Sequence, residues 1–133
     1  MLSDEQFARI LEFRVALRRF GRFSEEQAAR LGMTAAQHQL LLAIRGHGDP
    51  LGPTIADVAR ALLIRHHSAV GLVDRTRDLG LIERRRDDQD HRLVRLHLTS
   101  LGHDRVNALA QAHLKELQEL AEVLSALLST SEP

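Results

Sequence analysis

The sequence predicts a mainly α-helical domain that carries one small β-hairpin. Apolar residues recur every three or four positions over long stretches, and glycines and capping residues separate these stretches. Two short runs, at 81–86 and 92–99, instead alternate apolar and polar residues, as strands do. With 133 residues, of which 44% are hydrophobic, the chain can form one domain with its own core.

The first helix is predicted from Asp4 to about Leu31. All four phenylalanines of the chain lie in this segment, and its apolar side is formed by Phe7, Ile10, Phe13, Leu17 and Phe20. Gly32 follows as a C-terminal cap. Because this apolar side is long, we expect it to need a packing partner.

The next two helices each begin with a capping signal. Thr34 is followed three residues later by Gln37, and this second helix ends at Gly46. The loop "GHGDPLGP" then leads to Thr54, which has Asp57 three residues later. The third helix is therefore short, and Ile55, Val58, Ala59 and Leu62 form its apolar face.

A longer fourth helix is predicted from His66 to Leu79, with Gly80 at its end. Its buried face is expected to hold Ala69, Leu72, Val73 and Thr76. The alternating runs "LIERRR" and "RLVRLHLT" follow, joined by the polar turn "DDQD". A short helix, a tight turn, a longer helix and a hairpin together predict a winged helix-turn-helix.

The last helix is predicted from Ser100 to about Leu128. An apolar stripe runs along it, formed by Leu109, His113, Leu117, Leu120, Leu124 and Leu127. This helix is too apolar and too long to pack only on a small winged domain. Together with the phenylalanine-rich first helix, it predicts a dimerisation layer built from two chains.

Composition excludes several classes of protein. The chain has no cysteine, which excludes disulfides and thiol catalysis. No apolar run approaches the roughly 20 residues that cross a bilayer, and the N-terminal stretch resembles no signal segment, so we expect a cytoplasmic protein. No nucleophile–base pair or phosphate-binding loop is found, so we do not expect an enzyme. The net charge is zero, with 18 Lys+Arg and 18 Asp+Glu.

Three short motifs occur in the order and spacing of one known family. The most specific is D-x-R-x-x-R, formed by Asp90, Arg92 and Arg95 in the predicted wing. The sequence "LVDR" in the fourth helix and "LT-x-x-G" after the hairpin accompany it. On these motifs, the chain resembles the MarR family of bacterial transcription regulators over nearly its whole length.

The resemblance implies one MarR-type domain over residues 1–133. Residues 34–99 would form the DNA-binding core, and 1–33 and 100–133 the dimerisation helices. It also implies a homodimer, a repressor in many cases, that binds double-stranded DNA at a pseudo-palindromic operator. The fourth helix would enter the major groove and the wing would follow the minor groove. Many members release DNA when a small aromatic or phenolic effector binds between the two layers. No cofactor is implied.

The residues expected to contact DNA lie at the start of the fourth helix and in the wing. They are Arg65, His66, His67, Ser68, Gly71, Arg75, Arg86, Asp90, Arg92 and Arg95. Arg65 departs from the family pattern, which usually has a small capping residue such as Ser or Asp there. Asp90 is expected to hold a wing arginine in a forked geometry while Arg92 reaches the minor groove. The alternative is a solvated polar turn, whose ion pairs contribute about 0–1 kcal/mol.

Aromatic and histidine side chains leave further alternatives open. Phe20 and His38 are candidates to line an effector pocket, although His38 could equally cap or pack. His113 on the apolar stripe is interpreted as a core or dimer-contact residue. A metal site at His66 and His67 is the rival interpretation, but zinc needs three or four converging ligands and no such spacing occurs.

A helical protein-interaction module, or anti-regulator without DNA affinity, is the competing function. The zero net charge favours this alternative, whereas the arginines of the wing and the fourth helix favour DNA binding. A gel shift against the DNA upstream of the protein's own gene separates the two.

Overall fold

Residues 1–130 form five helices and one hairpin, in the order that the sequence predicts. The structure is a computed structural model that describes these residues; positions 131–133, which end the predicted dimerisation segment 100–133, lie outside it. The elements are α1 (Asp4–Arg30), α2 (Ala35–Arg45), α3 (Ile55–Leu62), α4 (His66–Asp78), β1 (Ile82–Arg86), β2 (Val94–Leu98) and α5 (Ser100–Thr130).

Side-chain caps explain where α2 and α3 begin. The hydroxyl of Thr34 accepts the backbone N–H of Gln37 at 3.1 Å, and the Gln37 side chain accepts the N–H of Thr34 at 2.9 Å. Thr54 and Asp57 repeat this exchange at the start of α3, at 3.1 and 3.0 Å. Both predicted capping boxes are therefore confirmed, since each satisfies two backbone donors reciprocally.

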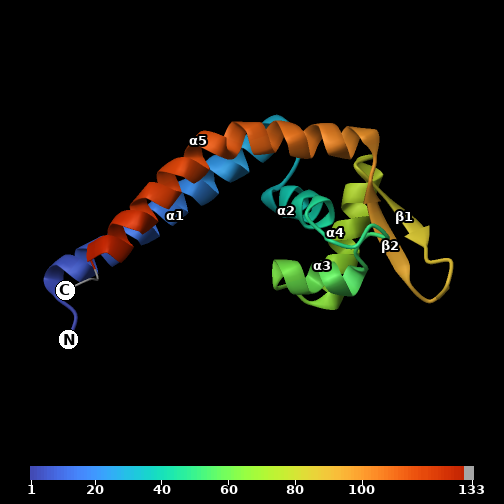
Figure 1. Cartoon of the computed structure of the whole chain (residues 1–133). Helices are drawn as coiled ribbons and strands as arrows, with labels where there is room; N and C mark the ends of the chain where they lie inside the picture. Colours follow the sequence, from blue (N-terminus) through green and yellow to red (C-terminus); the bar gives the residue numbers. More distant parts are fainter. Residues whose placement is uncertain (131–133) are drawn as a thin grey trace.

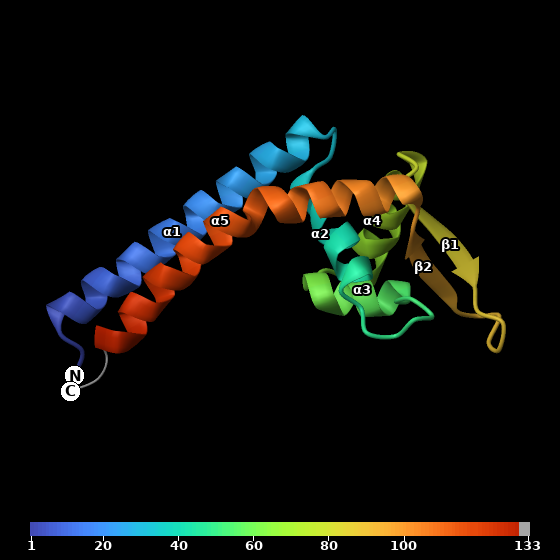
Figure 2. The same cartoon turned by 45° about the horizontal axis from the view of Figure 1, so that its top comes forward.

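The two terminal helices form a long arm that projects from the rest of the molecule. Helix α1 lies antiparallel to the C-terminal half of α5, and both chain ends lie at the far end of the arm (Figures 1 and 2). The N-terminal half of α5 instead crosses above α2 and α4 and meets the hairpin (Figure 1). The arm leaves many large apolar side chains exposed, among them Phe7, Leu11, Leu114, Leu117 and Leu124.

The core lies between α2, α3, α4, the hairpin and the first half of α5. Its most deeply buried large side chains are Leu40, Leu41, Val58, Val73, Leu96 and Leu109. The predicted inner face of α4 is confirmed, because Ala69, Leu72, Val73 and Thr76 are all buried. The hydroxyl of Thr76 donates to the carbonyl of Leu72 at 2.7 Å, which satisfies a polar group inside this core.

The hairpin is antiparallel and its register fixes which arginines share a face. Ile82 pairs with Leu98, Arg84 with Leu96, and Arg86 with Val94. Ile82, Arg84 and Arg86 therefore lie on one face of β1, because side chains alternate along a strand.

The motif "LT-x-x-G" joins the hairpin to α5. The Thr99 hydroxyl donates to the carbonyl of Gly80 at 2.7 Å and accepts the N–H of Gly102 at 3.1 Å. A Cβ at Gly102 would overlap the carbonyl oxygen of Leu81. Threonine and glycine are therefore both required for α5 to start against the turn that follows α4.

Candidate nucleic-acid interface

The turn between α3 and α4 brings the start of α4 to the surface. Leu63 adopts the left-handed conformation, with φ of 56°, and so ends α3 abruptly. Arg65 is the N-cap residue of α4 but makes no side-chain cap bond, in line with its departure from the family pattern. His66, His67 and Ser68 in the first turn are exposed. Unpaired N–H groups at a helix start attract anions, so this end suits a phosphate.

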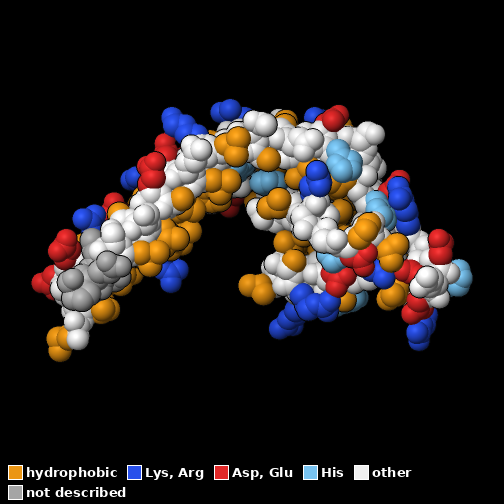
Figure 3. Space-filling view, in the orientation of Figure 1, with side chains coloured by type: hydrophobic (Ala, Val, Ile, Leu, Met, Phe, Trp, Pro, Cys, Tyr) orange, Lys and Arg blue, Asp and Glu red, His pale blue; other side chains and the backbone are white. Residues whose placement is uncertain are grey.

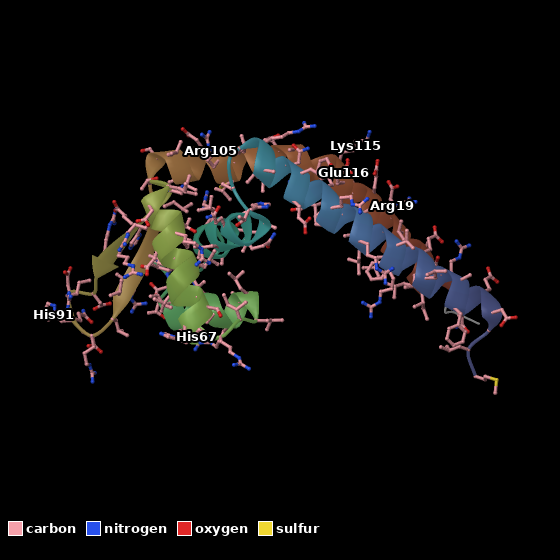
Figure 4. All side chains as sticks on the ribbon, turned by 180° about the vertical axis from the view of Figure 1, so that it is seen from behind. Arg19, His67, His91, Arg105, Lys115 and Glu116 are labelled. Atoms are coloured by element: carbon pink, nitrogen blue, oxygen red, sulfur yellow. The ribbon has the colours of Figure 1, made fainter. Side chains whose placement is uncertain are left out.

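The outer side of α4 carries a small residue beneath a long cation. A Cβ at Gly71 would lie 3.1 Å from Nη1 of Arg75, so the guanidinium extends back over the glycine. His67, Gly71 and Arg75 are spaced by four residues and share this outer side. Viewed from behind, His67 at the start of α4 and His91 at the wing tip lie at the same edge of the molecule (Figure 4).

The wing turn is organised by Asp87, which the sequence did not single out. Its carboxylate accepts the backbone N–H groups of Gln89 and Asp90 at 2.8 and 2.9 Å. It also accepts Nε of Arg95 at 3.0 Å. These hydrogen bonds, with that from the Asp90 N–H as the largest contribution, lower the pKa of Asp87 below its usual value.

Arg95 is directed into the protein. Its side chain is 17% exposed, and Nη1 donates to the carbonyl of Gly52 at 3.2 Å in addition to the Asp87 bond. Next to it, the N–H of Leu96 donates to the carbonyl of Pro53 at 2.9 Å, and residue 95 forms a β-bridge with Thr54. Arg95 was predicted to contact DNA. In the structure its guanidinium instead donates to Asp87 of the wing turn and to Gly52 in the loop before α3.

Asp90 holds Arg92 at the tip of the wing. Its two carboxylate oxygens accept Nε and Nη2 of Arg92 at 3.0 and 3.1 Å, and the backbone N–H of Arg92 donates to it at 3.1 Å. The Arg92 side chain is 90% exposed. The side-chain hydrogen bonds between the two residues are the largest cause of two pKa shifts: the pKa of Asp90 is lowered and that of Arg92 is raised. Arg86 donates to the carbonyl of His91 at 2.9 Å and so stiffens the same turn.

Charges of both signs gather on this side of the molecule. Basic side chains project at the lower edge of α3 and at the lower tip of the wing, with acidic side chains close to those of the wing (Figure 3). A third aspartate, Asp74 on the outer part of α4, forms an ion pair with Arg84 of β1. That contact spans ten positions, and no sequence pattern indicated it.

The predicted effector residues lie where the arm meets the core. His38 is buried, its ring centroid is 5.3 Å from that of His113, and its Nδ1 has no partner among the described residues. Burial, and then the charge of His113, lower the pKa of His38. Phe20 makes an edge contact with His113 at 5.7 Å and also lines a groove of about 510 Å³ between α1 and α5.

His113 is a core residue of this junction. Nδ1 lies 2.6 Å from the carbonyl of Leu109, and Nε2 lies 2.9 Å from the hydroxyl of Ser24. Since a carbonyl only accepts, Nδ1 donates to Leu109, and Nε2 shares the second hydrogen bond with the hydroxyl of Ser24. Within residues 1–130, no three His, Asp or Glu side chains converge as metal ligands do, and no helix there is long and apolar enough to cross a membrane.

The fold and this interface define a winged helix-turn-helix protein, and comparisons with known proteins show which family it resembles. Residues 31–93 match the model of the MarR family. The regulator PecS of Dickeya dadantii (strain 3937), an HTH-type transcriptional regulator, is 23% identical over 93 residues. That match covers 70% of this chain, and the chain spans only 56% of the length of PecS.

Solved structures share the fold over nearly the whole chain. MarR from E. coli without ligand is 22% identical, with a TM-score of 0.73, and 100% of this chain and 98% of that chain are covered. The MepR–DNA complex from S. aureus is also 22% identical, with a TM-score of 0.73 and coverages of 98% and 97%. The resemblance found in the sequence is confirmed, because residues 31–93 match the MarR family model and solved MarR-family structures share the fold over nearly the whole chain.

Proposed function

We propose that the protein is a homodimeric repressor that binds a pseudo-palindromic operator on double-stranded DNA. The observation that carries this proposal is the exposed Arg92, held in a fork by Asp90 at the wing tip while the open start of α4 lies on the same side. An exposed arginine of fixed direction suits the narrow, negatively charged minor groove. The start of α4 would enter the adjacent major groove.

The arm supports the dimer. Its lower edge forms a nearly continuous apolar surface in the space-filling view (Figure 3). Large apolar surfaces rarely stay exposed in a soluble monomer, and here they belong to both terminal helices. A second copy would cover both surfaces by a two-fold arrangement and place two recognition helices on one side.

The geometry of α4 and the wing supports a proposal for individual DNA contacts. We propose that His67 and Gly71 face bases, that Arg75 binds phosphate, and that the flanking first-turn and wing residues support them. They are Arg65, His66, Ser68 and Arg86. For Arg95 the internal bonds favour positioning of the wing over contact with DNA. Release by a small aromatic effector near Phe20 and His38, and action in the cytoplasm, remain parts of the proposal.

Binding to a labelled duplex tests the function. We expect the protein to bind the DNA upstream of its own gene more tightly than a scrambled duplex of the same length. Footprinting should then protect two half-sites about 10 bp apart, because each subunit presents one recognition helix. Equal affinity for both duplexes, or a single protected half-site, would contradict a symmetric operator-binding dimer. No shift at any protein concentration would favour a protein-interaction module.

A further inference from the structure

Helix α4 and the wing are joined covalently by a short turn only. Residues 79–81 connect Asp78 to Ile82, and Gly80 in this turn has a φ of 77°. The inner residues of the hairpin pack in the same core as Leu72 and Val73 of α4, and side-chain bonds that cross from α4 to the wing add to this packing in setting their mutual angle. In a DNA-binding protein of this design the angle matters, because helix and wing must reach two different grooves at once.

One ion pair crosses directly from α4 to the wing. Nη2 of Arg84 on β1 contacts Oδ1 of Asp74 on α4. Arg84 lies on the face of β1 that also carries Ile82, and it pairs across the hairpin with the fully buried Leu96. The side chain therefore leaves the sheet on its inner face, toward α4, and is only 29% exposed.

The neighbouring arginine provides a contrast. Arg85 lies on the opposite face of β1 and pairs with Glu83 of the same strand, so it connects nothing beyond the strand itself. Asp74 has one other cation near it, Arg77 of its own helix, at 3.9 Å. Of these two ion pairs of Asp74, that with Arg84 connects two elements.

Charge alone gives no reason for an aspartate at this position. Asp74 lies on the outer part of α4 and is 43% exposed, so it would repel phosphates on the proposed DNA side. We infer that Asp74 and Arg84 are positioning residues that fix the angle between the recognition helix and the wing. The effect of this angle on DNA binding rests on the proposed function. The angle itself is a property of the protein without DNA.

Asp78 offers a matched control. It lies four residues after Asp74 on the same side of α4, is 73% exposed, and forms an ion pair with Arg77 of its own helix, at 3.8 Å. Asp74→Asn and Asp78→Asn remove the same charge from the same helix. Only the first of these variants removes the ion pair that crosses to the wing.

The angle can be measured without DNA. Because the chain has no cysteine, Ala61→Cys on α3 and Gln89→Cys at the wing tip, both exposed, can carry two spin labels. Labelled chains are diluted with unlabelled ones so that each dimer reports one pair. Asp74→Asn should broaden the distance distribution, and Asp78→Asn should leave it unchanged. The exchange of Asp74→Arg with Arg84→Asp should narrow it again.

DNA binding provides the second measurement. On a duplex selected by the wild-type protein from a random pool, Asp74→Asn should weaken binding about tenfold, because a mobile wing must be ordered in the complex. On a scrambled duplex it should bind as tightly as wild type or more tightly. Asp78→Asn should not weaken binding to either duplex.

The outcomes separate the two proposals. A distance distribution in Asp74→Asn that equals that of wild type and Asp78→Asn overturns the positioning role. If Asp74→Asn does not fold, the exchanged pair decides: a folded protein with the wild-type distribution supports the role, and a broad distribution overturns it. If the wild type selects no DNA, the proposed function fails, while the spin-label distances still show whether the pair holds the wing.

Discussion

Replacement of Asp90 by alanine tests whether the aspartates of the wing direct its arginines. Asp90→Ala removes the two carboxylate oxygens that hold the guanidinium of Arg92 at 3.0 and 3.1 Å. It also removes a negative charge close to the proposed DNA surface. The two effects have opposite signs, since loss of a negative charge favours binding to phosphate, whereas a freed arginine must be ordered again.

The magnitudes follow from the geometry of one wing. Arg92 is 90% exposed, and within residues 1–130 its guanidinium is held by Asp90 alone, so the Asp90 substitution frees it. Ordering it costs about fivefold in affinity per subunit, or about 25-fold for a dimer. Arg92→Ala removes one contact per subunit and should reduce the salt slope by about 1.8 per dimer. Between 50 and 200 mM salt, the advantage of wild type over Arg92→Ala should then shrink about 12-fold.

Fluorescence anisotropy on a duplex selected by the wild-type protein measures both effects at two salt concentrations. Asp88→Ala is the matched control, because Asp88 is an exposed residue of the same turn and carries the same charge. We expect Asp90→Ala to bind more weakly and Asp88→Ala to bind as tightly as wild type or more tightly. If both variants bind more tightly by the same factor, Asp90 is part of a solvated turn and the directing role is refuted.

Three further predictions concern the dimer, the packing of α5 and the arm junction. Leu11→Glu in the arm groove should convert a dimer into a monomer by light scattering, whereas Leu51→Glu, at a similarly exposed leucine in the α2–α3 loop, should not. Gly102→Ala should lower the unfolding free energy by about 1–3 kcal/mol, because the added Cβ overlaps a carbonyl, whereas Gly21→Ala in open space within α1 should raise it by about 0.5–1 kcal/mol in denaturant titrations. The pKa of His38 is lowered in the folded state, so the unfolded chain takes up the proton first as the pH falls. The unfolding free energy should therefore decrease as the pH drops below about 6.5 toward that lowered pKa. His38→Gln should show a smaller decrease over the same pH range, and equal decreases in both proteins would contradict this origin.

The elements were predictable because their signals are local. The capping boxes at Thr34 and Thr54 involve residues three positions apart, and the inner face of α4 repeats at helical spacing. The fork between Asp90 and Arg92 is equally local, since two residues of one turn form it. The chain therefore carries these features in short stretches that can be interpreted without knowledge of the fold.

The connections between elements were not predictable for the opposite reason. Asp87 and Arg95 are eight residues apart, and Arg95 and Gly52 are 43 apart. Three aspartates occupy the "DDQD" turn, and only the hairpin register determines which of them reaches Arg95. For the same reason, the motif D-x-R-x-x-R predicted Arg95 as a DNA contact and did not indicate its bonds to Asp87 and Gly52.

His38 and His113, where the arm meets the core, also have contacts that the sequence did not predict. The spacing placed His113 on an apolar stripe and left a core and a dimer role open, and the structure makes it a core residue through Ser24. For His38 the sequence offered a pocket, a cap or a packing role. Burial of its ring against His113 shows packing in the single chain, and the effector role stays a prediction.

The pairing of charges explains how a chain without net charge can suit DNA. Arg84, Arg92 and Arg95 each have an aspartate partner, so this side of the molecule has less net positive charge than its arginines suggest. Two of these pairs connect the wing to its neighbours, and the third directs one exposed guanidinium. With fewer unpaired cations, attraction to any DNA duplex is weaker and depends less on salt. The arginines held by aspartates keep a fixed geometry, which suits a duplex of matching sequence and shape. Under the proposed function, mixed charge at this interface would thus favour discrimination between sequences over affinity for DNA in general.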